Sequence, residues 1–198
     1  MAVRFQYNKT SLNDLNRQLR VRVRALPTLK NKESALRMEV KRARDMATEF
    51  EAKVKQKTAA LEKFMRLWTE FDTKLISIRN VEMHTKKIAG VKIPIMGNIT
   101  YDYAEFSVFN RPKWYLDGIK IIEELSAITI ERQFYIRKMR ILDQVRKKTT
   151  QKVNLYEKVQ IPAYEDAIRK IKRFLEDEEN LSKSGQKIMK NRNSEVAS

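Results

Sequence analysis

An apolar pattern with a period of about 3.5 residues runs from Leu12 to Ile78. Alternating steps of three and four residues along this stretch reach apolar side chains almost everywhere, and only Arg22, Glu33 and Lys57 interrupt them. A sustained period of this kind is typical of the seam of a left-handed coiled coil. A helix of that length, roughly 100 Å at about 1.5 Å per residue, cannot bury its own stripe. The pattern therefore predicts a long helix over about residues 8–80 that needs a partner helix.

A second ladder of the same period supplies that partner over about residues 114–181. It runs from Ile121 to Tyr156, slips by one residue, and continues from Ile161 to Leu175. The slip lies beside Pro162, where we expect a kink. In the first helix, Pro27 predicts a kink or a break into two helices with the seam phase kept. The polar residues 182–198 are expected to form a fraying tail.

Charged residues within the two ladders are expected to set register rather than to carry chemistry. Buried polar groups in a coiled coil fix the alignment of the helices at a cost in stability. The five residues concerned are Arg22, Glu33, Lys57, Arg132 and Arg146.

The pattern changes between the two ladders, over residues 88–109. This stretch is rich in β-branched and aromatic residues, and Gly97-Asn98 separates two such runs. Glycine supplies the positive φ that a tight hairpin turn requires. We therefore predict an all-α-dominated fold with one elongated domain over residues 1–198, built as a long antiparallel two-helix coiled coil with a short central β-hairpin.

The amino-acid composition is typical of long helices and limits the classes of function that the chain can have. Glycine and proline number four each, and charged residues make up 34%. The sequence has no cysteine, no signal-peptide pattern and no apolar run long enough to span a membrane. The net charge of +17 is concentrated in residues 1–60 and 132–175, each of which has a net charge of +9. This surface suits acidic partners or nucleic acid, or is a solvated coiled-coil face.

The sequence contains no recognisable catalytic constellation. It has one histidine, no phosphate-binding glycine loop, and no inward-facing carboxylate and histidine set of a metal-binding bundle. We therefore predict a chain that is not an enzyme and that binds no cofactor, metal or nucleotide directly.

Two segments resemble the D subunit of V/A-type (vacuolar/archaeal-type) rotary ATPases in its bacterial or archaeal form. The segment KTTQKVNL at 148–155, followed by Ile161-Pro162, is similar to a KTTRRVNALE…IP block of that family, and LKNKESAL at 29–36 is similar to its LLKKKRDAL block. Gln151 and Glu33-Ser34 depart from these blocks. The positions that carry the resemblance are Leu29, Lys30, Lys32, Leu36, Lys148, Thr149, Thr150, Val153, Asn154, Ile161 and Pro162.

This resemblance implies a central rotor axle that transmits torque between ATP hydrolysis or synthesis in a hexamer and ion translocation in a membrane ring. The implied partners are the catalytic A and non-catalytic B subunits, a small F subunit on the central stalk, and a funnel-shaped C/d-type subunit above the ring. The implied location is peripheral, on the cytoplasmic face of the membrane in the soluble ATPase sector. The ion, proton or sodium, is set by the membrane ring.

Two alternatives remain from the sequence. A gamma-like axle of F-type enzymes carries a globular insert between its helices, for which residues 80–113 are short. A basic helical hairpin that binds nucleic acid or anionic membrane fits the charge, but the sequence lacks groove-reading motifs and interleaved aromatic residues.

Overall fold

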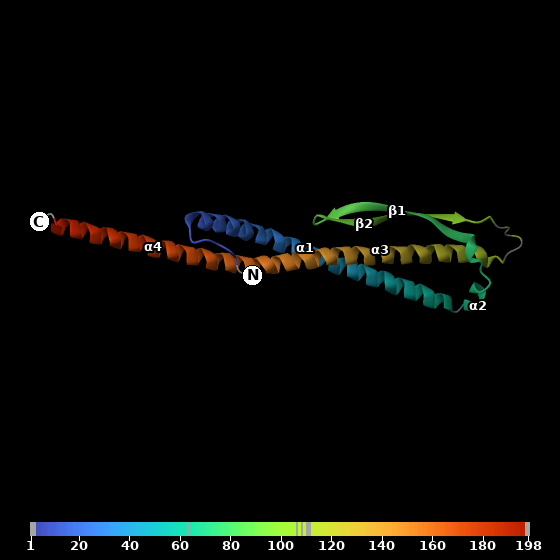
Figure 1. Ribbon diagram of the computed structural model, residues 1–198. Helices are drawn as coiled ribbons and strands as arrows, with labels where there is room; N and C mark the ends of the chain where they lie inside the picture. Colours follow the sequence, from blue (N-terminus) through green and yellow to red (C-terminus); the bar gives the residue numbers. More distant parts are fainter. Residues whose placement is uncertain (1–2, 63, 106, 108, 110–111, 197–198) are drawn as a thin grey trace. The chain divides into compact units, whose positions relative to one another are not determined.

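The computed structural model describes residues 3–62, 64–105, 107, 109 and 112–196 and is mostly helical (Figure 1). The elements in chain order are helix α1 (Lys9–Glu62), the short helix α2 (Met65–Trp68), a 3-10 turn (Thr73–Leu75), strands β1 (Ile76–Ile88) and β2 (Val91–Tyr103), helix α3 (Trp114–Asn154), a π-helical turn (Leu155–Gln160) and helix α4 (Ile161–Val196). The predicted fold class, helical with one short β-hairpin, is confirmed.

The chain divides into two compact units, which we call the terminal unit (Met1–Lys32 with Lys148–Ser198) and the hairpin unit (Glu33–Lys147). Each contains part of α1 and part of the second helical stretch, by which we mean α3, the π-helical turn and α4 together. Whether the two form the single elongated domain expected from the sequence stays a prediction.

The terminal unit is held together by the predicted ladders. Leu15 of α1 packs with Tyr164, Ile168 and Ile171 of α4, all buried, and Leu12 and Leu19 add to this cluster. The partner of a residue on α1 moves toward the N-terminus of the second stretch as the α1 number rises: Gln18 contacts Tyr164, and Lys30 contacts Glu157. The helices of this unit are therefore antiparallel, as predicted.

The hairpin unit has a core in which both ladders and the hairpin meet. Leu36 and Val40 of α1, Val91 and Ile93 of β2 and Leu142 of α3 form one buried cluster. Farther along, the rings of Phe50 and Tyr135 stack 5.4 Å apart. The buried side chains of α1 in this unit, namely Leu36, Val40, Ala43, Ala47 and Phe50, all lie on the ladder read from the sequence.

The predicted hairpin exists, but its turn was placed wrongly. Gly97 and Asn98 lie inside β2, and the turn is Ala89-Gly90, where both residues have positive φ (48° and 78°). The strands pair antiparallel from Ile76 with Tyr103 to Ile88 with Val91, over residues 76–103 rather than 88–109. Gly97 serves a different purpose, because a Cβ there would lie 3.0 Å from Nε2 of His84 on the facing strand.

Two helix boundaries also differ from the prediction. The first helix ends at Glu62 rather than near residue 80, because the aromatic residues that follow leave the helix to form a separate cluster. Trp68, Phe71, Trp114 and Tyr115 have ring centroids 4.8–5.9 Å apart, and Phe71 and Tyr115 are buried. The β-branched residues after Leu75 then favour strand β1.

At the other end, residues 182–196 are helical rather than a fraying tail. Lys183 pairs with Glu179 one turn earlier at 2.7 Å, an i,i+4 contact that stabilises the helix at the start of this segment. Helix α1 passes through Pro27 without a break, so of the two outcomes predicted there only a kink within one helix remains.

The aromatic cluster explains the glycine at position 118 and yields a test of the packing. A Cβ at Gly118 would lie 2.8 Å from Cε2 of the buried Phe71, whereas one at Gly185 of α4 meets nothing within 4 Å. We expect Gly118→Ala to lower the free energy of unfolding by about 1–3 kcal/mol through overpacking. We expect Gly185→Ala to raise it by about 0.5–1 kcal/mol through helix propensity. Urea unfolding of both variants measures this, and equal effects of the two substitutions would contradict the packing.

Candidate functional site

The terminal unit brings together most of the positions that carry the sequence resemblance. Leu29, Lys30 and Lys32 lie on α1, and residues 148–162 lie on the end of α3, the π-helical turn and the start of α4. The Nζ of Lys30 lies 2.6 Å from Oε1 of Glu157, so the two motif segments are in direct contact. Leu36 lies in the hairpin unit, in its buried core.

These positions divide into seam and surface residues. Thr149 and Val153 are buried, Leu29, Lys32, Thr150 and Ile161 are half-buried, and Lys30, Lys148, Asn154 and Pro162 are exposed. The buried members therefore hold the helices together, and the exposed members are available to other proteins. Their roles in binding partners stay predictions.

Arg22, one of the polar seam positions, anchors a side-chain cluster beside the π-helical turn. Its Nε donates to Oε1 of Gln160 at 2.7 Å, and its guanidinium lies 4.6 Å from the centroid of the Tyr164 ring. The hydroxyl of Tyr164 donates to Oε1 of Gln18 at 2.8 Å. We call these four residues, Gln18, Arg22, Gln160 and Tyr164, the Arg22 cluster. Sequence reasoning found Arg22 but missed Gln160, because the ladder was read as slipping by one residue from Tyr156 to Ile161, which passes over Gln160.

Three ion pairs cross between α1 and α3 in the hairpin unit. Lys57 pairs with Glu124, Arg132 with Glu51 at 3.5 Å, and Lys138 with Glu39 at 3.8 Å. Lys57 and Arg132 are seam positions predicted to set register, and their partners on the facing helix fit that role. Among the described residues, the buried Nε of Arg132 has no hydrogen-bond partner, so the pair with Glu51 is the contact shown for this guanidinium.

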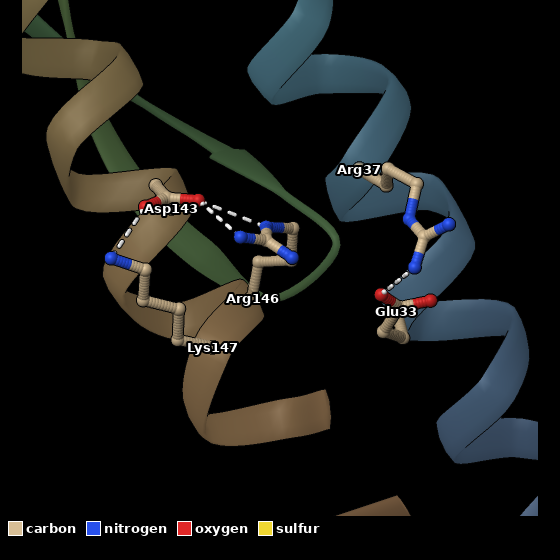
Figure 2. Close-up of polar contacts among 5 residues, drawn as sticks. All are labelled: Glu33, Arg37, Asp143, Arg146 and Lys147. Atoms are coloured by element: carbon tan, nitrogen blue, oxygen red, sulfur yellow. Dashed lines mark hydrogen bonds and ion pairs between the residues drawn. The ribbon is translucent and has the colours of Figure 1, made fainter. Parts of the chain in front are cut away.

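The other two seam charges, Glu33 and Arg146, contact residues of their own helices. Figure 2 shows Arg37 donating to Glu33 at 2.9 Å on α1, and Arg146 donating to Asp143 at 2.7 and 2.9 Å on α3. Lys147 also lies 3.3 Å from Asp143. The hydrogen bond from Arg146 is the largest of the influences that hold the pKa of Asp143 below its usual 3.8.

The outer surface of the terminal unit is strongly basic. Residues 15–32 of α1 contain six lysines and arginines and no acidic residue. Among them, Arg17, Arg20 and Arg24 are exposed and follow one another at helical spacing. In the described residues, no group of three or more His, Asp or Glu side chains is placed to hold a metal ion. Residues 15–32 therefore give α1 a positively charged stretch in the terminal unit.

The hairpin presents apolar side chains to solvent. Met83, Ile78 and Ile95 are 63%, 46% and 40% exposed. Of these three residues, Ile95 lines a groove of about 200 Å³ between the hairpin and α3. Its lining residues are Pro94, Ile95, Met96, Glu131, Phe134, Tyr135 and Lys138. Met83 pairs with Met96 and Ile95 with His84, so the side chains of Met83 and Ile95 lie on opposite faces of the hairpin.

Comparison with known proteins decides the family. The sequence profile of the ATP synthase D subunit matches residues 11–191, which include both ladders, the hairpin and the basic segments. The chain belongs to the ATP synthase D-subunit family. The D subunit of a V-type ATP synthase from Borreliella burgdorferi is 30% identical over 94% of this chain and 98% of its own length. The corresponding D subunits of Chlamydia muridarum and Chlamydia pneumoniae are each 28% identical over 89% of this chain, and 90% and 87% of their own lengths are covered.

Membership of the D-subunit family confirms the resemblance drawn from residues 29–36 and 148–162. It implies association with a V-type ATP synthase complex and a part in ATP synthesis and ion transport. None of the helices in the described part of the chain combines the length and apolar character that a membrane crossing requires.

The ion pairs of Asp143 give a pH-dependent test. Because its pKa is lowered on folding, its carboxylate stabilises the native state above about pH 4, and this contribution is lost as the pH falls through the folded-state pKa. We expect Asp143→Asn to cost about 0.5–1 kcal/mol at pH 7 and progressively less below pH 4. Urea unfolding between pH 2 and pH 7 measures the difference, with Asp45→Asn on the exposed face of α1 as the control. A cost that does not change with pH would contradict the assignment.

Proposed function

We propose that this chain is the central rotor axle of a V-type ATP synthase. It transmits torque between ATP hydrolysis or synthesis in a hexamer and ion translocation in a membrane ring. The observation that carries the proposal is the seam: in both units, buried ladder residues of α1 interlock with those of the second helical stretch. In this role the chain is a non-catalytic part of the complex.

Interlocked helices suit the transmission of torque. Twisting one helix past its partner would expose the buried residues of the ladder, at a cost of about 1.5–3 kcal/mol for each large side chain. The ion pairs of Lys57, Arg132 and Lys138 add cross-helix ties in the hairpin unit. Two helices fastened in this way turn as one body.

The proposed partners follow from the surfaces of each unit and from the family. The terminal unit, with its basic surface, lies within the hexamer of catalytic A and non-catalytic B subunits. The hairpin unit carries the small F subunit, and its end around the aromatic cluster docks in a funnel-shaped C/d-type subunit above the membrane ring. The chain is thereby peripheral, on the cytoplasmic face, and binds neither nucleotide nor nucleic acid itself.

A reversible disulfide between this chain and the hexamer tests directly whether the chain is an axle. The sequence has no cysteine, so Lys187→Cys introduces a single thiol on an exposed turn of α4. Paired with a cysteine on the facing surface of the hexamer in the assembled complex, it forms a disulfide on oxidation. We expect oxidation to abolish steady-state ATP hydrolysis and reduction to restore it, because an axle tied to its housing cannot turn.

The control is the complex with Lys187→Cys alone, which should keep its activity under the same oxidation. A passive scaffold or a nucleic-acid-binding protein gives no reversible loss. Hydrolysis at the full rate with the cross-link verified would exclude the axle.

The apolar side chains that the hairpin exposes to solvent support a second, separate part of the proposal, the binding of the F subunit. We expect Met83→Glu to weaken the complex with the F subunit at least tenfold, because it places a charge on the most exposed of these apolar side chains. Thr100→Glu, on an exposed position of the facing strand, makes the same change of charge and should have little effect. Titration with the purified F subunit measures both. If Met83→Glu binds as well as the parent protein, the face of the hairpin that carries Met83 is not the binding surface.

A further inference from the structure

The π-helical turn at Leu155–Gln160 divides the second helical stretch into α3 and α4. The backbone N–H of Ile161 donates to the carbonyl of Tyr156, five residues earlier, where an α-helix would use the carbonyl four residues earlier. A turn of this kind holds one more residue than an α-helical turn. None of its side chains is buried.

The extra residue accounts for the slip in the second ladder. Thr149 and Ile171 are both buried and are 22 positions apart, which is three heptads plus one residue. Val153 and Ile168, also buried, are 15 positions apart, which is two heptads plus one. The π-helical turn absorbs the surplus residue, so the buried residues before and after it face the same seam.

A surplus residue does not by itself have a fixed place in a helix, because any turn of the helix can hold it at a similar backbone cost. The Arg22 cluster contacts one particular turn of the second helical stretch, the π-helical turn 155–160. The Nε of Arg22 holds Gln160, the last residue of the turn, at 2.7 Å, and its guanidinium covers the ring of Tyr164 one turn farther on. Arg22 also donates to the carbonyl of Gln18 on its own helix at 3.0 Å, which fixes the direction of its side chain.

We propose that Arg22 is a positioning residue that confines the surplus residue of the second helical stretch to the turn 155–160 and thereby fixes the register of α4 on α1. Pro162 supports the same placement, since it has no N–H to donate back to this turn. The device concerns the terminal unit alone, and its test does not depend on the axle.

Single-residue deletions test whether the turn holds the surplus. Deletion of the exposed Val159 converts the turn to an α-helical one and leaves every buried residue in phase, so we expect a melting temperature within about 3 °C of the parent. Deletion of the exposed Lys158 is the second variant and should behave alike. Deletion of the exposed Lys41 is the matched control: it shifts the ladder of α1, which has no π-helical turn, and should lower the melting temperature by at least about 10 °C.

A double-mutant cycle then tests Arg22 itself. We expect Arg22→Met to lower the melting temperature of the parent by more than it lowers that of the Val159 deletion, because the deletion has no surplus residue to confine. Arg24→Met, on an exposed position of α1, should change neither. Two outcomes overturn the proposal: both turn deletions are as harmful as the deletion of Lys41, or Arg22→Met has the same effect in both backgrounds.

Discussion

The structure depends on the burial of a helical stripe that no single helix can cover. Helix α1 has 54 residues, and its apolar side chains recur every three or four positions. Such a stripe is buried from water only when it packs against a second helix with the same period. In the terminal unit that partner is α4, and in the hairpin unit it is α3, with the hairpin completing the core at Val91 and Ile93. The antiparallel pairing in each unit follows from this constraint.

Apolar ladders alone do not fix the register of the two helices, because one leucine can pack in the place of another. The charged positions within the seams restrict it. Arg22 reaches Gln160 in the terminal unit, and Lys57 and Arg132 reach glutamates on the facing helix in the hairpin unit. A slipped register would leave these half-buried charges without their partners, which costs more than an exposed pair contributes. The same ties make the proposed transmission of torque physically reasonable.

The parts of the structure that follow from a local period were predictable from the sequence. The buried residues of α1 all lie on the ladder, and the one-residue slip near Pro162 corresponds to the π-helical turn. The remaining features are decided by contacts between residues that are far apart in the sequence. The ladder reading extends through Phe71 and Leu75, yet these side chains are buried in a separate aromatic cluster beyond the end of α1. Gly97 has the sequence of a hairpin turn but allows His84 to pack across the strand, and Gln160 lies at the slip of the second ladder, where the reading passes from Tyr156 to Ile161.

The most direct measurement of the proposed role is the orientation of the hairpin while ATP is hydrolysed. A single cysteine at the exposed Thr85 of β1 carries a visible probe, and the hexamer of the assembled complex is fixed to a surface. If this chain is the axle, the probe turns in one direction in repeated steps at the rate of hydrolysis and stops when ATP is removed. A probe that keeps a fixed orientation while the same complexes hydrolyse ATP at their full rate would contradict the proposal.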